Sequence, residues 1–81
     1  MPLTAKENRL LAALKAKRLE VARDQKLPAF IIFHDKVLIA MARARPKTRE
    51  DMLAIPGIGP DKDARYTAIF LALIAVHSDD S

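Results

Sequence analysis

The segment spanning residues 43–49 carries a dense positive charge. Four of its seven residues are basic and none is acidic; the basic ones are Arg43, Arg45, Lys47 and Arg49. Such side chains neutralise phosphates, and the counterions they release make binding depend on salt. An ordinary solvated loop would look the same, and the sequence leaves both interpretations open. For a second basic group, Lys15, Lys17 and Arg18, a solvated helix face is favoured.

Four acidic side chains follow soon after: Glu50, Asp51, Asp61 and Asp63. All are expected in first turns of helices, where the helix dipole favours acids. They lack the compact ligand spacing of a calcium loop, so we expect no metal site. Another interpretation is an acidic patch that docks on a basic partner domain. Residues 1–49 hold 12 Lys/Arg and 4 Asp/Glu, a balance of +8, whereas residues 50–81 hold 2 and 6, a balance of −4.

Catalytic chemistry finds little support. His34 and His77 lie far apart in the sequence, there is no cysteine, and no glycine-rich nucleotide-binding loop is present. Surface or helix-capping roles are favoured for both histidines. We therefore expect a binding module with no catalytic residue, no cofactor and no small-molecule ligand.

The composition is that of a single globular domain over residues 1–81. It is 51% hydrophobic and 30% charged, without strand-like alternation, so we expect an all-α fold. The longest apolar stretch, Tyr66–Val76, has 11 residues, whereas a membrane span needs about 17–25. Because it is apolar on all sides, it predicts a buried central helix. The core should span about residues 5–77, with 78–81 as a polar tail.

The first helix is expected to run from Thr4 to about Lys26. Thr4 and Glu7 fit a capping box, and Pro28 disfavours helix at Leu27. The predicted core stripe is Leu10, Leu14 and Val21, helped by Leu11, Ala13 and Ala22. Beyond it, Pro28–Phe33 should form an extended apolar connector, because six residues make no convincing strand without a partner.

Three further helices are predicted. Asp35 should cap one that ends near Ala44, and Thr48 should cap a short one. A tight turn at residues 56–59 then leads to Pro60, which suits the first position of a helix ending near His77. The inward-facing residues of the two middle helices are predicted to be Val37, Leu38, Met41, Met52, Leu53 and Ile55.

Two segments, Leu27–Asp35 and Ile55–Lys62, are the most distinctive, and at this separation they resemble the HRDC domain of RecQ-type DNA helicases and ribonuclease D. The resemblance covers roughly Leu10 to Val76. It implies a compact bundle of about five helices or helical turns, with orthogonal packing and no active site. Such a domain assists a helicase or nuclease by touching nucleic acid or by contacting other domains. Thr67 departs from the family, which often has glycine there.

The resemblance places Phe30 on the connector near basic side chains. An exposed aromatic there would stack on an unpaired base, at about 1–3 kcal/mol per base. The alternative is that Phe30 fills the core, which is what we expect of Phe33. Near the start of the last helix, Lys62 and Arg65 could reach phosphates and Tyr66 could stack, although packing of Tyr66 in the core is favoured.

The stretch Leu53–Pro60 also resembles a helix-hairpin-helix element, in which backbone N–H groups of the turn hold a DNA phosphate. Pro60 lacks an N–H, and Asp61 and Asp63 would repel a phosphate. In the plainer interpretation, the glycines only make a tight turn.

Two functions of different classes remain open. The first is an accessory domain of a RecQ-type helicase that binds single-stranded or branched DNA weakly. The second is a protein-interaction module whose acidic patch docks on the helicase core or another domain. Attachment to a ribonuclease D-like exonuclease, with RNA as the polyanion, is a third possibility. In each case we expect a piece of a larger protein, in the cytoplasm, with no membrane partner.

Overall fold

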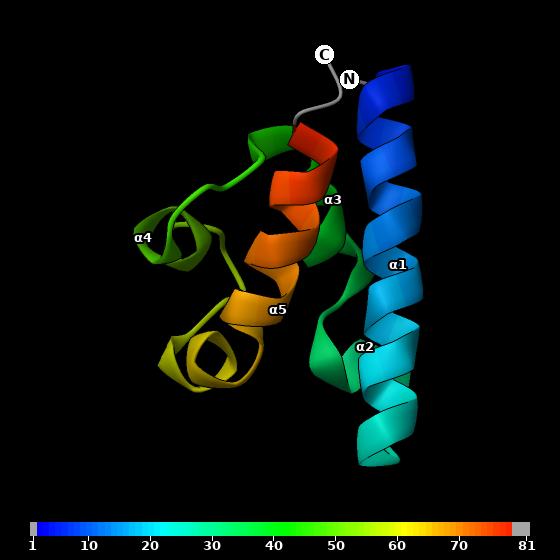
Figure 1. The fold of residues 1–81 in the computed structure, drawn as a ribbon. Helices are drawn as coiled ribbons and strands as arrows, with labels where there is room; N and C mark the ends of the chain where they lie inside the picture. Colours follow the sequence, from blue (N-terminus) through cyan, green and yellow to red (C-terminus); the bar gives the residue numbers. More distant parts are fainter. Residues whose placement is uncertain (1, 79–81) are drawn as a thin grey trace.

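The computed structural model describes residues 2–78, and all regular structure in that range is helical (Figure 1). This confirms the all-α prediction. The helices in chain order are α1 (Ala5–Gln25), α2 (Ala29–Ile32), α3 (Asp35–Ala44), α4 (Arg49–Leu53) and α5 (Pro60–Ser78). Of the polar tail predicted for residues 78–81, Ser78 is the last residue of α5, and residues 79–81 lie outside the described part.

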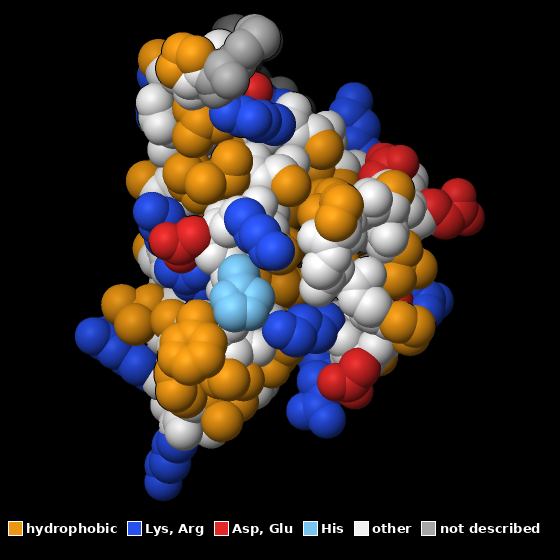
Figure 2. All heavy atoms as spheres, turned by 180° about the vertical axis from the view of Figure 1, so that it is seen from behind, with side chains coloured by type: hydrophobic (Ala, Val, Ile, Leu, Met, Phe, Trp, Pro, Cys, Tyr) orange, Lys and Arg blue, Asp and Glu red, His pale blue; other side chains and the backbone are white. Residues whose placement is uncertain are grey.

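Helix α1 forms one side of the molecule and α4 lies on the other, with α5 between them (Figure 1). The contacts agree: α1 packs against α2, α3 and α5, whereas α4 packs against α5. The described chain measures 34 × 24 × 24 Å. On the face seen from behind, hydrophobic and charged side chains are mixed (Figure 2).

Helix α1 begins and ends as predicted. The Thr4 hydroxyl accepts from the Glu7 N–H at 3.1 Å, and the Glu7 carboxylate accepts from the Thr4 N–H at 2.9 Å. This capping box satisfies two backbone donors that the helix leaves unpaired. Lys26 ends the helix in the left-handed conformation, with φ of 57°. The predicted core stripe is confirmed except that Ala13 is only half-buried; the buried residues of α1 are Leu10, Leu11, Leu14, Val21 and Ala22.

The predicted extended connector is wrong, because Ala29–Ile32 form the helical turn α2. Only the flanking residues Pro28 (φ −61°, ψ 145°) and Phe33 (φ −152°, ψ 143°) are extended. Ile32 and Phe33 are both 0% exposed. A strand would send these neighbours to opposite faces. The turn lets both reach the core and leaves Phe30 outside.

The predicted capping role of Asp35 is also wrong. His34 occupies the N-cap position of α3 and makes no side-chain capping bond. The Asp35 carboxylate instead accepts from Arg18 Nη1 at 2.7 Å, and the same nitrogen donates to the Phe33 carbonyl at 3.0 Å. Arg18 is therefore no solvated residue, since its side chain is only 12% exposed. It ties α1 to the junction of α2 and α3.

The region before α5 follows the prediction closely. The Thr48 hydroxyl caps α4 by accepting from the Asp51 N–H at 3.1 Å. Met52 and Ile55 are buried as predicted, but Leu53 is exposed. Gly57 has φ of 99°, and a Cβ there would lie 2.7 Å from Val37 Cγ2. The turn needs glycine at this position, both for its backbone conformation and for its close approach to α3.

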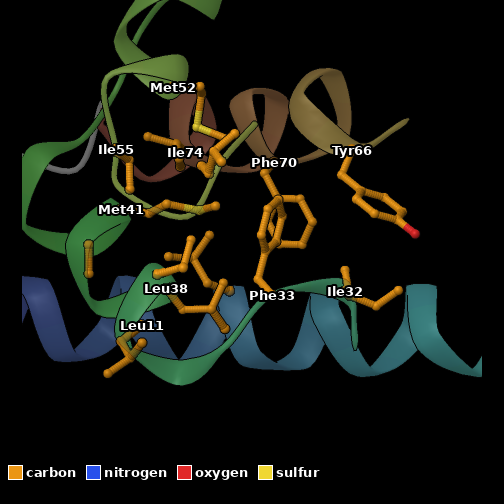
Figure 3. Packing of buried hydrophobic residues seen from close by; sticks show 14 of the residues in the cluster. Leu11, Ile32, Phe33, Leu38, Met41, Met52, Ile55, Tyr66, Phe70 and Ile74 are labelled. Atoms are coloured by element: carbon orange, nitrogen blue, oxygen red, sulfur yellow. The ribbon is translucent and has the colours of Figure 1, made fainter. Parts of the chain in front are cut away.

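The core centres on three aromatic rings (Figure 3). Phe33 meets Phe70 edge to face with centroids 5.3 Å apart, and meets Tyr66 in the same way at 5.7 Å. Phe33 reaches upward from the α2–α3 junction to α5, so it joins segments distant in sequence (Figure 3). Its predicted role as a core residue is confirmed.

Helix α5 is not buried on all sides, contrary to the prediction. Phe70 and Ile74 are 0% exposed, whereas Ile69 is 40% and Val76 72% exposed. The residues that pack against the other helices are buried, whereas the exposed positions of α5 include Ala64, Ala68, Ala72 and Ala75. A domain this small buries too little of its surface to enclose a helix completely.

Candidate nucleic-acid interface

The most exposed aromatic side chain of the described chain is Phe30, at 56%. Its ring stacks on His34 at a centroid distance of 6.2 Å and an interplanar angle of 25°. Leu27 and Ile31, 40% and 43% exposed, lie beside it in the sequence. We call Leu27, Phe30, Ile31 and His34 the aromatic platform. Figure 2 shows hydrophobic side chains gathered next to a histidine, with lysines and arginines around them.

Lys62 is fixed beside this platform. Its Nζ donates to the Ile31 carbonyl at 2.9 Å and lies 5.6 Å from the centroid of the Phe33 ring. Both contacts suit an ammonium group, which carries three donors and is attracted to the face of an aromatic ring. Lys62 thus joins the first turn of α5 to α2 and brings a positive charge to the edge of the platform.

The two other basic or aromatic candidates of α5 differ in placement. Tyr66 is 4% exposed, its ring packs on Phe33, and its hydroxyl donates to Gln25 Oε1 at 2.8 Å. A base cannot stack on so buried a ring, so Tyr66 is a core residue and not a stacking surface. Arg65 is exposed, and its Nε donates to Asp61 Oδ1 at 3.3 Å.

The basic segment, residues 43–49, connects α3 to α4. Arg43 lies in the last turn of α3 and is exposed. Arg45 follows it in the left-handed conformation and is half-buried. Lys47 is exposed, and its backbone N–H donates to the Asp51 carboxylate at 3.1 Å. The segment is therefore a capped connection whose basic side chains reach solvent to different degrees.

Arg49, the first residue of α4, meets a buried acid on α5. Its Nε lies 2.5 Å from Asp63 Oδ2, and the two side chains are 70% and 1% exposed. The Thr67 hydroxyl is the main cause that holds the pKa of Asp63 below its ordinary value, and Arg49 adds to it. By geometry the hydroxyl makes no hydrogen bond, since Thr67 Oγ1 and Asp63 Oδ1 are both buried without such a partner among the described residues. The ion pair between Arg49 and Asp63 connects α4 to α5.

The first turn of α5 joins the two candidate regions. Lys62 reaches α2 on one side, and its neighbour Asp63 reaches Arg49 of α4 on the other. In Figure 1 this turn, in yellow, lies below α4 and to the left of α2. The aromatic platform and the end of the basic segment therefore flank one helical turn, although they are distant in sequence.

The acidic residues fall in first turns of helices, as predicted. Asp63 is buried, whereas Glu50, Asp51 and Asp61 are exposed. Asp51 accepts from the Lys47 backbone and Asp61 pairs with Arg65, so the exposed acids are partly engaged. Within the described residues, no three His, Asp or Glu side chains are grouped as metal ligands. In the glycine turn, the Ile58 N–H donates to the Ile55 carbonyl.

Two contacts near the aromatic platform were not predicted from the sequence: the stacking of His34 on Phe30 and the hydrogen bond between Tyr66 and Gln25. The stacking of His34 on Phe30 had no helical signal, because α2 ends at Ile32 and Phe33 is extended. The bond between Gln25 and Tyr66 spans 41 residues and had no local signal.

Acid is expected to destabilise the fold through Asp35 and Asp63. The hydrogen bond from Arg18 is the main cause that lowers the pKa of Asp35, and the pKa of Asp63 is lowered too. A carboxyl group with a lowered pKa stabilises the fold above its unfolded pKa, about 3.9, and this is lost as pH falls through the folded pKa. The urea midpoint should therefore drop below about pH 4.

The measurement is urea unfolding followed by circular dichroism across this pH range. Asp63→Asn should flatten the acid limb of the profile, because it removes one of the two carboxyl groups. Asp24→Asn, at an exposed position of α1, is the matched control and should leave the profile unchanged. An Asp63→Asn profile parallel to that of the wild type would contradict the expectation.

Arg45→Gly should stabilise the domain. Arg45 has φ of 47° and ψ of 60°, a conformation that glycine adopts without the steric penalty of a Cβ. Relief of the left-handed penalty, about 1–2 kcal/mol, should exceed the entropic cost of glycine, about 0.5–1 kcal/mol, so we expect the free energy of unfolding to rise by up to about 1 kcal/mol. Lys15→Gly, at an exposed helical position of α1, should lower it by about 1 kcal/mol. Both variants would be measured by urea unfolding. An equal loss in the free energy of unfolding for Arg45→Gly and Lys15→Gly would show that the left-handed conformation of Arg45 carries no penalty.

Within the described residues, every helix is too short or too polar to span a lipid bilayer. The HRDC domain family matches residues 7–74. The chain is 38% identical over 68 residues to the ATP-dependent DNA helicase RecQ of Pasteurella multocida, and 40% identical over 68 residues to the ATP-dependent DNA helicase UvrD2 of Mycobacterium tuberculosis. The RecQ helicase of Bacillus subtilis is 33% identical over 69 residues.

These alignments cover 84–85% of this chain but only 10–12% of each relative, so the chain matches a small part of each helicase. The relatives therefore include helicases of two names, RecQ and UvrD2. The HRDC domain is a non-catalytic accessory domain of helicases. The aromatic platform, the glycine turn and Lys62 all lie inside the matched region, and the chain belongs to the HRDC domain family.

Proposed function

We propose that this domain is the accessory single-stranded DNA-binding module of a DNA helicase. The observation that carries the proposal is the exposed Phe30, stacked on His34 and bordered by Lys62. An exposed aromatic next to a cation is the recurring arrangement for stacking an unpaired base. The matched relatives are named as DNA helicases, which favours DNA over RNA as the ligand.

A single strand would place one base on Phe30 and pass its backbone over the first turn of α5. Phosphates would then meet Lys62 and the basic segment: Arg43, Arg45, Lys47 and Arg49. Asp61 stands on this path and its side chain is 82% exposed, which keeps the affinity low. The parent helicase would perform the unwinding in the cytoplasm, and this domain would influence which DNA it engages.

The test is a fluorescence anisotropy titration of the domain with a labelled oligothymidylate at two salt concentrations, about 50 and 200 mM. Binding that weakens clearly at the higher salt supports the proposal. An RNA strand of equal length, run in parallel, should bind no more tightly. A flat curve at the lower salt would overturn direct DNA binding, and tighter RNA binding would favour a nuclease as the parent.

A second candidate function is contact with the parent helicase core. The observation that favours it is the apolar outward side of α5, where Val76 is 72% exposed. Two variants would be made in the full-length parent protein. Val76→Lys tests the apolar side of α5, and Glu50→Lys tests the exposed acidic side chain of α4. Altered unwinding with unchanged DNA affinity of the isolated domain would support docking. Unchanged unwinding by both variants would exclude it.

A further inference from the structure

We infer that Asp63 is a positioning residue for Arg49, holding its guanidinium so that the outer nitrogens face solvent as a preformed phosphate contact. The inference rests on the proposed DNA-binding function and names a part of that site. The sequence suggests the opposite role, because an acid beside Lys62 would be expected to repel the DNA backbone.

The two partners differ in burial: Asp63 is buried and holds the arginine, whereas Arg49 is exposed and can bind a ligand. Asp63 is held within the fold with its side chain 1% exposed, whereas the Arg49 side chain is 70% exposed. Asp63 is the hydrogen-bonding and ionic partner that Arg49 has among the described residues. The arginine therefore stands between the carboxylate and solvent, and a phosphate would meet the arginine first.

The chemistry of guanidinium allows both contacts at once. The group is planar and carries five N–H donors in a fixed fork, so it can bind one oxyanion through Nε and another through its terminal nitrogens. Asp63 occupies the Nε side. The edge formed by the two Nη atoms suits the bidentate recognition of phosphate.

The surroundings of Arg49 leave room for such a ligand. Arg49 lines two surface hollows, one with Thr48, Glu50 and Leu53, the other with Asp63, Ala64, Thr67, Ala68 and Leu71. Lys47 lies two residues before it on the same basic segment and is exposed. A strand that reaches Lys47 can therefore reach the outer edge of Arg49.

Two effects of Asp63 oppose each other, and their balance can be measured. Fixing the guanidinium in advance spares part of the rotamer entropy that a mobile arginine loses on binding. The carboxylate also cancels part of the arginine's charge. If positioning dominates, Arg49 contributes more to DNA binding when Asp63 is present. If charge cancellation dominates, Arg49 contributes more when Asp63 is absent.

The experiment is a double-mutant cycle with the wild type, Arg49→Gln, Asp63→Asn and the double variant, titrated with the labelled oligothymidylate. Arg49→Gln should weaken binding by about threefold to tenfold in the wild type, and by less than about twofold beside Asp63→Asn. An equal or larger loss in the Asp63→Asn background would overturn the inference. A wild type that does not bind would instead overturn the proposed function.

A second variant keeps the test valid if Asp63→Asn does not fold. Arg49→Lys retains both the charge and the acid, but its compact ammonium group lacks the planar fork that offers phosphate a bidentate edge. It should weaken binding clearly while keeping the salt slope of the wild type, whereas Arg49→Gln should lower that slope by about 0.7, the loss of one phosphate contact on a single strand. Wild-type binding by Arg49→Lys would exclude positioning. Arg9→Lys on α1 is the matched control and should bind normally.

Discussion

Phe33→Ala should lower the free energy of unfolding by about 3–5 kcal/mol, the range for truncating a fully buried aromatic. Phe33 is 0% exposed, and its ring is the common neighbour of Tyr66 and Phe70. Alanine would leave a cavity between α5 and the α2–α3 junction. A domain of this size has a total stability of about 4–12 kcal/mol, so this one change could remove most of it.

The measurement is urea unfolding followed by circular dichroism at low temperature, where a weakened fold is still populated. Phe33→Leu, which fills part of the space, serves as a measurable intermediate and should lose clearly less than Phe33→Ala. A loss below about 1 kcal/mol for Phe33→Ala would mean that the aromatic cluster does not hold the core together.

Phe30→Ala should have the opposite effects to Phe33→Ala, a small change in stability and a large loss of DNA affinity, although Phe30 is only three residues from Phe33. Because the ring is 56% exposed, stability should change by no more than about 0.5 kcal/mol. The affinity for single-stranded DNA should fall by about fivefold to 150-fold, which corresponds to the loss of one stacked base. The anisotropy titration measures the affinity, and urea unfolding checks the fold.

Leu19→Ala is the matched control for this substitution. Leu19 lies on α1, outside the aromatic platform, and is 43% exposed, but it offers no aromatic face. We expect less than about a twofold change in affinity. Phe30→Tyr should bind nearly as well as the wild type, because it keeps the ring. If Phe30→Ala binds DNA normally, the platform does not stack a base.

Local signals predicted the starts of three helices correctly. Thr4, Thr48 and Pro60 mark where α1, α4 and α5 begin, because capping and the fixed φ of proline depend on residues only a few positions away. The need for glycine at position 57 could also be anticipated from its turn. The resemblance to the HRDC domain placed Phe30 correctly on the segment between the first two long helices.

The errors have a common physical origin in contacts between distant segments. Whether Asp35 caps its helix or pairs with Arg18 depends on where α1 passes, 17 residues earlier. The pairing of Arg49 with Asp63 spans 14 residues, and that of Lys62 with Ile31 spans 31. The uniformly apolar composition of α5 gave no indication of which side its neighbours would cover.

Low affinity is consistent with an accessory role. A domain tethered to a helicase meets DNA that the helicase already holds, so its effective concentration near that DNA is high. One stacked base and a few phosphate contacts are then sufficient to influence which strand is engaged. In the proposed complex, Phe30, Lys62 and Arg49 would provide these contacts around the first turn of α5.

The central claim, that single-stranded DNA binds across the first turn of α5, is tested most directly by an NMR titration. A ¹⁵N-labelled domain would be titrated with oligothymidylate while its backbone amide signals are followed. The account predicts that the shifts concentrate in residues 27–36, in the basic segment and in residues 61–65. The absence of shifts at high protein concentration, or shifts confined to the outward side of α5 around Ile69 and Val76, would contradict it.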